Sequence, residues 1–247
     1  MSVGPVPRAI TACRNFGLLF LLLLFAAPLA TRFGLISYPL GLPLTALAVV
    51  GATLVLTAAL IMLSRARFHA WRSHLGPSAL IAALPVIAGI TIIAQGAGRP
   101  VIHDISTDSL DPPHFDAVLA LRGPAANPLT RDAQTGAAQR AGYPGLSAIE
   151  SSLAPEAAFT QALNTARSLG WQIHQSDAAR GTLEASETTF WFGFTDDIVI
   201  RVRPHNGGSR IDLRSVSRVG RGDLGANARR ILRFSTVFGA IEPQIPP

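Results

Sequence analysis

The chain of 247 residues carries a formal net charge of +6, and this excess lies in the first 98 residues, which contain six arginines and no acid. From Arg99 onward fifteen arginines balance fifteen acids, so the second part lacks the basic excess typical of nucleic-acid-binding domains. The single cysteine, Cys13, excludes an internal disulfide, and the second part has no cysteine for a thiolate metal site. We therefore expect no nucleic-acid partner, no metal and no cofactor.

Three long apolar runs follow one another in the first part of the chain, at residues 15–36, 42–63 and 78–97. A helix of about 20 apolar residues is long enough to cross the hydrocarbon core of a bilayer. No ionisable residue lies in the middle of any run, although a proton or ion relay would need one. The runs predict a membrane anchor of three helices at residues 15–98, preceded by a cytoplasmic tail at residues 1–14.

The arginines around the three runs predict the orientation of the anchor. Two precede the first run and three lie in the loop from Ser64 to His74, whereas only Arg32 lies near the other loop. Because arginines collect on the cytoplasmic side, we expect a multi-pass protein of the bacterial inner membrane with a cytoplasmic amino terminus and a periplasmic domain after Gly98. Cleavage after Ala30 stays an alternative for the first run, and it would leave the topology of the rest unchanged.

Residues 99–155 are rich in proline, glycine and aspartate and show no helical or strand period, which predicts an irregular arm. Apolar residues recur in its first part, and we expect them to pack across the domain that follows. They are Val101, Ile102, Ile105, Phe115, Val118 and Leu121.

Residues 156–240 alternate between helical and strand-like patterns, and a short tail at residues 241–247 follows them. Apolar residues at helical spacing predict a helix that starts at Pro155 and Glu156 and ends at Gly170. A second helix is predicted from Asp223 to Phe238. Between them lie four predicted strands, at residues 171–177, 181–194, 197–204 and 209–218, with the hairpin turn "HNGG" at 205–208. This order predicts an α+β domain in which an antiparallel four-stranded sheet carries two helices on one face.

Several motifs of this part resemble the domain of unknown function 1499 family, which occurs in bacteria and in plant plastids. The motifs are "RPVIHDISTD", "DPPHF", "GW" at 170–171, "LEA" at 183–185, "FGFTDDIVIRVRP" and "RIDLRSVSRVGRGDLGANARRI". The resemblance covers about residues 99–238, and the chain departs from many relatives at "YPGL" (143–146), where they have an acid and an isoleucine. It implies no catalytic residues, and it implies that the three spans are similar to the membrane anchor of some bacterial members.

The stretch "RSVSRVGRGDLGANARR" (214–230) supports two hypotheses. Its glycines, arginines and predicted helix start could hold a phosphate or carboxylate. Alternatively, Asp223 caps the helix and the arginines pair across the sheet with Glu184, Asp196 or Asp212, and we favour this structural network. If a ligand binds between this stretch and "HDISTD" (103–108), its predicted site consists of His103, Asp104, Arg214, Ser217, Arg218, Arg221, Asp223 and Asn227.

Other residue patterns point to less specific chemistry. The spacing in "HDISTD" fits no familiar set of metal ligands. Asp196 and Asp197 are adjacent, so on a strand their side chains point to opposite faces, which does not suit a paired acid and base. We predict that the four aromatic residues between 190 and 194 contact the core or a membrane surface rather than nucleic-acid bases.

The sequence favours a non-enzymatic binding or interaction module of the cell envelope that recognises an anionic group. Its predicted partners are membrane lipids and an envelope protein. The alternative is a cofactor-free envelope enzyme that uses Asp196, Asp197 or His103 in the same cleft.

Overall fold

The computed structural model describes residues 5–241 and divides the chain into two compact units. The first unit comprises residues 1–95 together with Phe190–Gly193, and the second comprises the remaining residues from Gly96 onward. Residues 1–4 of the predicted cytoplasmic tail and residues 242–247 of the predicted carboxy-terminal tail lie outside the described residues.

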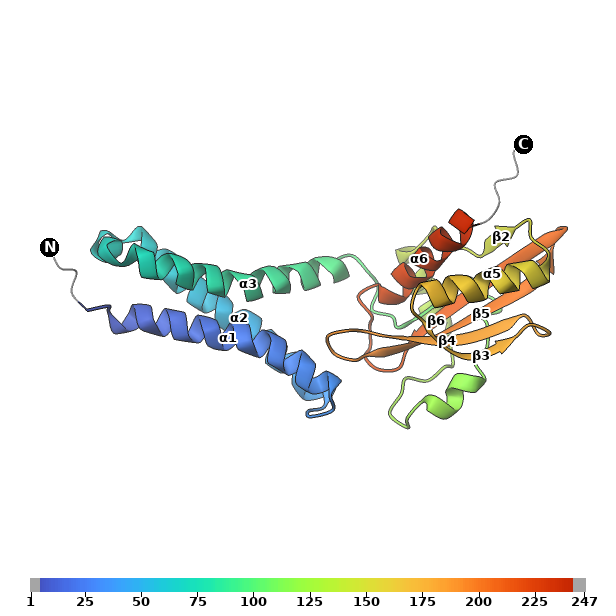
Figure 1. The fold of residues 1–247 in the computed structure, drawn as a ribbon, viewed down its shortest axis with the longest axis horizontal. Coiled ribbons are helices and arrows are strands. Elements are labelled where there is room, and N and C mark those ends of the chain that lie inside the picture. The colour runs from blue at the N-terminus through green and yellow to red at the C-terminus, as the bar shows by residue number, and fades with distance from the viewer. Residues whose placement is uncertain (1–4, 242–247) are drawn as a thin grey trace. The chain divides into compact units, whose positions relative to one another are not determined.

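The first unit is built on three long helices, α1 (Arg8–Arg32), α2 (Tyr38–Ser64) and α3 (Arg72–Gly96), with the short 3-10 helix η1 (Ala66–Trp71) leading into α3 (Figure 1). The stretches Arg8–Arg32, Tyr38–Ser64 and Ala66–Gly96 are each long and apolar enough to cross a membrane. This confirms three candidate spans, and each helix starts several residues before the apolar run that predicted it.

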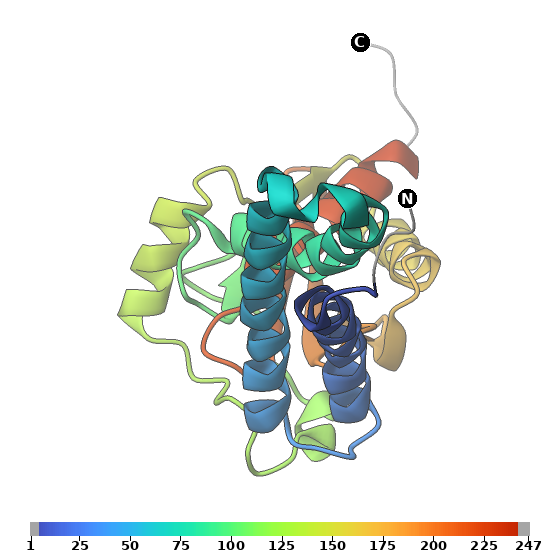
Figure 2. The same ribbon diagram turned by 90° about the vertical axis from the view of Figure 1, so that its left-hand side faces the viewer.

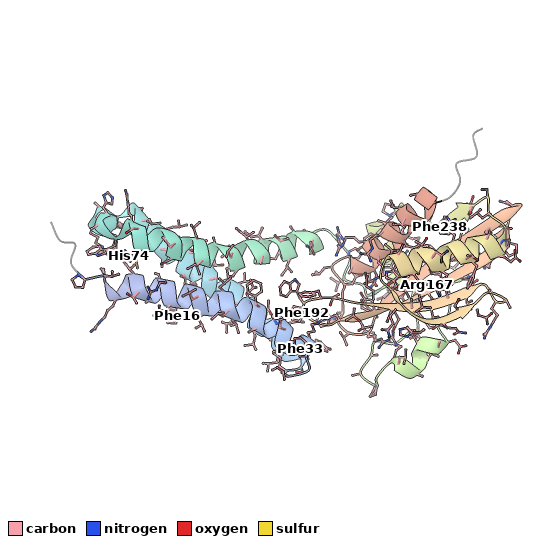
Figure 3. The ribbon with its side chains drawn as sticks, viewed as in Figure 1. Phe16, Phe33, His74, Arg167, Phe192 and Phe238 are labelled. Carbon is pink, nitrogen blue, oxygen red and sulfur yellow. The ribbon has the colours of Figure 1, made fainter. Side chains whose placement is uncertain are left out.

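Helix packing in the first unit places small residues inside and large apolar residues outside. In α2, Ala48 and Ala52 are completely buried, whereas Leu54 is 68% exposed. A Cβ atom on Gly51 would lie only 2.2 Å from the ring of Phe20, so the glycine allows α1 and α2 to approach closely, side by side as in Figure 2. Phe16 on α1, labelled in Figure 3, is also exposed. Small residues at helix contacts and large apolar residues facing outward suit a hydrocarbon solvent.

The second unit contains one antiparallel sheet. Its strands are β1 (Asp104–Ser106), β2 (Ile149–Ser151), β3 (Gln172–Asp177), β4 (Thr182–Thr188), β5 (Thr195–His205) and β6 (Gly208–Ser217), in the order β1-β6-β5-β4-β3, and β2 also pairs with β6. The four predicted strands are thus joined by two short ones from the predicted arm. In the turn between β5 and β6, Asn206 and Gly207 have φ values of 47° and 80°, the left-handed conformation that a two-residue hairpin turn requires.

Helices α5 (Pro155–Ser168) and α6 (Ala226–Ile241) cover one face of this sheet, as predicted (Figure 1). The register places Leu183, Ile200 and Leu213 of neighbouring strands side by side on this face. Phe234 of α6 is completely buried, and its ring stacks on Trp171 with 5.4 Å between the centroids. This layer is the main hydrophobic core of the domain.

The predicted irregular arm contains short regular elements that cover the other face and one edge of the sheet. Besides β1 and β2 it forms the 3-10 helix η2 (Ala117–Leu121) and α4 (Ala133–Gly142). Four of its six apolar residues are buried as expected, whereas Val101 and Leu121 are exposed. The arm acquires this structure because β6 offers its free edge to β1 and β2.

Two predicted element boundaries are wrong. The strand predicted to reach Phe194 ends at Thr188, because the backbone turns at Gly193, whose φ is 68°. The last helix starts at Ala226 rather than Asp223, because Leu224 and Gly225 have φ values of 51° and 79°, which a right-handed helix excludes.

Candidate functional site

A layer of buried charges lies on the sheet face opposite α5 and α6. Glu184, Val199 and Arg214 lie side by side on this face, and Asp197 and Asp212 follow on neighbouring positions of the strands. All four charged residues are buried. Because an unpaired charge is very unfavourable away from water, each needs a partner, and the arm supplies most of them.

Asp104 of β1 binds two arginines. Arg214 donates from Nε to Oδ1 at 3.1 Å and from Nη2 to Oδ2 at 2.8 Å, so the pair is bidentate. Arg131, from the segment before α4, donates from Nη1 to the same Oδ1 at 3.1 Å. Arg214 also donates to the backbone carbonyl groups of Pro113 and Leu129. The Asp104 carboxylate and its partner Arg214 therefore tie β1, the neighbouring strand β6 and two further parts of the arm together.

Asp197 of β5 also pairs with two arginines, nearer the end of β6. Arg218 donates from Nη2 to its Oδ1 at 2.7 Å, and Arg122 of the arm forms a second ion pair with its Oδ2. Arg218 also donates to the backbone carbonyl of Leu121, the last residue of η2. The sequence predicted partners for Arg214 and Arg218 among Glu184, Asp196 and Asp212, and these partners are wrong. The arm adds Asp104 from another strand, and Asp197 lies closer to Arg218 across the β5–β6 ladder.

Glu184 binds backbone groups instead of an arginine. Its carboxylate accepts the N–H groups of Asp116, Ala117 and Val118 at 2.7, 3.1 and 3.0 Å. These groups belong to the start of η2, where N–H groups have no partner within the helix. The carboxylate thus fixes η2 on the sheet.

A second polar cluster lies at the start of α6. Asn227 donates to the Ser217 hydroxyl at 2.9 Å and to the His103 carbonyl at 3.1 Å. Arg230 pairs with Asp196 at 2.6 Å and also contacts Glu187. Burial alone would raise the pKa of Glu187, but Arg230 and Arg233 together hold it below its ordinary value.

The eight residues of the predicted binding site do not surround one open cleft. Arg214, Arg218, Ser217 and Asn227 take part in the bonds described above. The carboxylate of Asp223 accepts the N–H groups of Gly225 and Asn227, so it caps α6 as the structural hypothesis expected. Arg221 is exposed in the loop before α6. The two arm residues of the set, His103 and Asp104, line a cavity beside β1.

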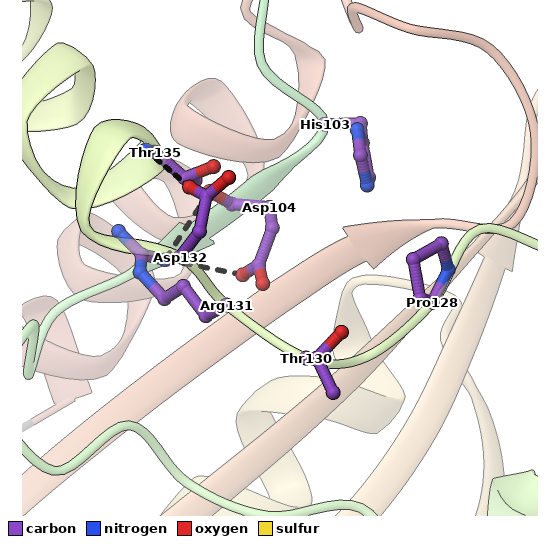
Figure 4. Close-up of a pocket in the computed structure, with 7 residues that line it drawn as sticks. All are labelled: His103, Asp104, Pro128, Thr130, Arg131, Asp132 and Thr135. Carbon is purple, nitrogen blue, oxygen red and sulfur yellow. Dashed lines mark hydrogen bonds and ion pairs between the residues drawn. The ribbon is translucent and has the colours of Figure 1, made fainter.

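That cavity has a volume of about 280 Å³ and lies between β1 and the start of α4 (Figure 4). Asp132 caps α4 at its rim by accepting the Thr135 N–H at 2.7 Å. The lining residues are His103, Asp104, Pro128, Thr130, Arg131, Asp132 and Thr135. Five of these seven were not predicted. The signal that could have shown them is Asp132 three residues before Thr135, a helix-capping pattern within the arm.

Arg131 is the unusual member of this cavity. Its side chain is only 6% exposed, and its Nη1 and Nη2 atoms donate to Asp104 and Gln139. Its Nε has no acceptor among the residues that the structure describes. Burial lowers the pKa of Arg131, the Asp104 carboxylate raises it, and the neighbouring Arg214 lowers it again. Arg131 therefore brings to the cavity an N–H group without an acceptor in the described part of the chain, together with a positive charge that shares the Asp104 carboxylate with Arg214.

The cavity offers hydrogen-bond donors rather than the parts of a metal site. Within residues 5–241 no three His, Cys, Asp or Glu side chains come together in a way that could hold a metal ion. Thr130 and Thr135 carry hydroxyl groups, and the imidazole of His103 can donate or accept. Such a set can bind an oxygen-rich group.

Comparison with models of protein families gives a match. The family model described as "Protein of unknown function (DUF1499)" matches residues 104–238, more than half of the chain. The match starts at the first residue of β1 and ends within α6, so it contains the whole ionic layer and every cavity residue except His103. No curated protein matches the chain.

The substitution Asp104→Asn is expected to lower the free energy of unfolding by about 3 kcal/mol, because it leaves two buried guanidinium groups without their counter-charge. Asp116→Asn is the matched control, since the Asp116 side chain is 72% exposed and lies 3.9 Å from an exposed Arg180. We expect little change there. Denaturant unfolding of the two variants checks this, and equal effects would contradict a central role for Asp104.

Glu187→Gln is expected to weaken the acid dependence of stability. Because the pKa of Glu187 is lowered in the folded chain, the unfolded chain binds the proton first as the pH falls. The stability from this carboxylate is thus present above its unfolded pKa of about 4.3 and is lost as the pH falls through the folded value. Unfolding free energies of both proteins, measured from neutral to acidic pH, should converge at low pH. A constant difference between the curves would refute the assignment.

Proposed function

The chain belongs to the DUF1499 family of proteins of unknown function, and on this premise we propose that it is a membrane-anchored module that binds a small anionic group beside Arg131. The family description names no activity, so the proposal rests on the cavity in the second unit.

The observation that carries the proposal is the buried Nε of Arg131, which lacks an acceptor among the described residues. A buried donor left unsatisfied costs about 1–3 kcal/mol, and more when it is charged. Arg131 lines the cavity, and a shift of its side chain would turn this buried N–H toward an oxygen atom of a bound phosphate or carboxylate group, which would supply the missing acceptor. Bonds between arginine and such oxygens are stronger than neutral hydrogen bonds.

The charges around the cavity support an anion. Arg131 and Arg214 are both buried, and they share the single buried carboxylate of Asp104. The other lining carboxylate, Asp132, is exposed to solvent and accepts a backbone N–H group of α4. The lining itself holds two carboxylates, Asp104 and Asp132, and one guanidinium, so the positive excess that favours an anion comes from Arg214, which pairs with Asp104 behind the lining. The cavity volume of about 280 Å³ suits a small group rather than a large ligand.

The alternative of an envelope enzyme receives less support from the geometry. Asp196 and Asp197 form ion pairs with Arg230, Arg218 and Arg122, so neither is free to exchange a proton with a substrate. His103 alone of the proposed catalytic groups lines the cavity. A binding role needs only the donors that the cavity already provides.

We further propose that the module belongs to the bacterial inner membrane and that its domain is periplasmic. Arg8 and Arg14 precede or begin the first span, and three more arginines lie between Ser64 and Arg72, at the same side of the anchor. Arg32 and Arg99 lie at the opposite side, two arginines against five, so the arginine bias favours a cytoplasmic amino terminus. Membrane lipids and an envelope protein are the proposed partners, and the balanced charge of the domain argues against nucleic acid.

Inorganic phosphate is expected to raise the unfolding temperature of the full chain in lipid nanodiscs in a saturable manner, because a ligand that binds only the folded state stabilises it. Chloride at equal ionic strength should not do so, and acetate tests whether a carboxylate suffices. Thr130→Leu, which narrows the cavity without removing an ion pair, is expected to abolish the effect.

The matched control for this experiment is Arg221→Ala, which removes a positive charge from the loop before α6, outside the cavity. We expect this variant to keep the full response to phosphate. Loss of the response in Arg221→Ala but not in Thr130→Leu would move the anion site to the start of α6. No response in the unchanged chain would refute the proposed function.

A reporter enzyme that requires export for activity, fused after Pro247, is expected to be active, because three crossings from a cytoplasmic amino terminus end in the periplasm. A fluorescent reporter that matures only in the cytoplasm should be dark at the same position. The opposite pair of results would reverse the proposed orientation.

A further inference from the structure

Two large aromatic side chains are exposed at the tip of the hairpin between β4 and β5. Phe190 is 66% exposed and Trp191 is 45% exposed. The main core of the second unit, in contrast, buries its aromatic residues Phe234, Phe238 and Trp171. Exposed aromatic residues next to each other on a surface indicate a place of contact.

The tip has a defined conformation. The Thr189 N–H donates to the Phe194 carbonyl at 2.8 Å, and the Phe194 N–H donates to the Thr189 hydroxyl at 2.9 Å. Gly193 adopts a φ of 68°, which closes the turn. The rings of Phe190 and Trp191 meet edge to face with 5.1 Å between their centroids. Within the same compact unit, the Arg32 guanidinium of α1 lies 5.3 Å from the centre of the Phe190 ring, and the Trp191 ring lies 5.6 Å from the ring of Phe25. Both rings are therefore held beside α1 before they meet lipid, which lowers the entropic cost of insertion.

Chain connectivity keeps this domain close to a bilayer. Helix α3, part of the third candidate span, ends at Gly96, and β1 starts at Asp104. Residues 97–103 can therefore reach no more than about 30 Å even when fully extended. A surface of the domain thus meets lipid at a high effective concentration, so even a small apolar tip can bind there.

We propose that the hairpin tip Phe190–Gly193 inserts into the interfacial region of the bilayer that holds the three spans. Phe190–Gly193 form one compact unit with the three apolar helices, apart from the rest of their domain. Tryptophan prefers the boundary between headgroups and acyl chains, because its ring is apolar and its N–H is polar. Residues 188–195 contain no acid, so the tip carries no charge that anionic headgroups would repel. This inference is independent of the anion site.

Spin labels on the full chain test the proposal in vesicles of phosphatidylcholine and phosphatidylglycerol. Cys13→Ser removes the single native cysteine, and Phe190→Cys then places a label at the tip. Leu110→Cys is the control, because Leu110 is a large apolar residue that is 95% exposed elsewhere in the second unit. Accessibility to oxygen, which concentrates in lipid, is compared with accessibility to a water-soluble nickel complex.

The tip label is expected to have a severalfold higher ratio of oxygen to nickel accessibility than the Leu110 label. Equal ratios with high nickel accessibility would show that the tip lies in water, and low accessibility to both reagents would show that protein covers it. Either result would overturn the proposal. Phe190→Cys removes one of the two rings, so a second experiment leaves both rings in place. The tryptophan fluorescence of the unchanged chain is compared with that of Trp191→Phe in vesicles of brominated lipid. The difference between them is the emission of Trp191, which the bromine atoms should quench. Unquenched Trp191 emission would likewise refute insertion.

Discussion

The bidentate ion pair between Asp104 and Arg214 determines how the second unit is assembled. It joins β1, the first strand after the membrane anchor, to β6 near the middle of the sheet, and Arg214 adds bonds to the carbonyl groups of Pro113 and Leu129. A buried pair of this kind contributes little net stability compared with apolar residues, but its geometry admits few alternative arrangements. The arm therefore has one register on the sheet although it has few regular hydrogen bonds of its own.

The two faces of the sheet follow different physical rules as a result. The face under α5 and α6 is closed by nonpolar contacts, which tolerate exchange among residues of similar size. The face under the arm is closed by charges and by backbone groups such as the N–H groups that Glu184 accepts. A small apolar cluster there consists of Phe115, Val118, Val199 and Val216, with Leu129 packed against them. In a buried layer of charges, a polar group without a partner is costly, because the surrounding dielectric constant is low. The Arg131 Nε is a donor of this kind, since it has no acceptor among the described residues.

Local patterns in the sequence were enough to predict the elements that their own residues determine. The apolar runs predicted the three candidate spans, the period of α5 predicted its buried face, and "HNGG" predicted the turn after His205. The arm could not be predicted in the same way, because its strands consist of three residues each and exist through pairing with β6. The partners of Arg214 and Arg218 depend on which strand lies beside β6, and residues 104 and 214 are distant in the chain. The cavity was missed for the same reason, since it forms only when Arg131 meets Asp104.

The position of the cavity in the chain connects it with the membrane anchor. His103 and Asp104 line the cavity, and they are the last residue of the segment 97–103, which links α3 to the sheet, and the first residue of β1. A ligand that binds Arg131 would therefore contact the point where this segment enters the sheet. The same Asp104 that holds this strand also holds Arg131, so the structure of the linker's end and the charge in the cavity depend on one carboxylate. Because three candidate membrane spans precede this domain, lipid headgroups are the source of phosphate groups that our proposal favours.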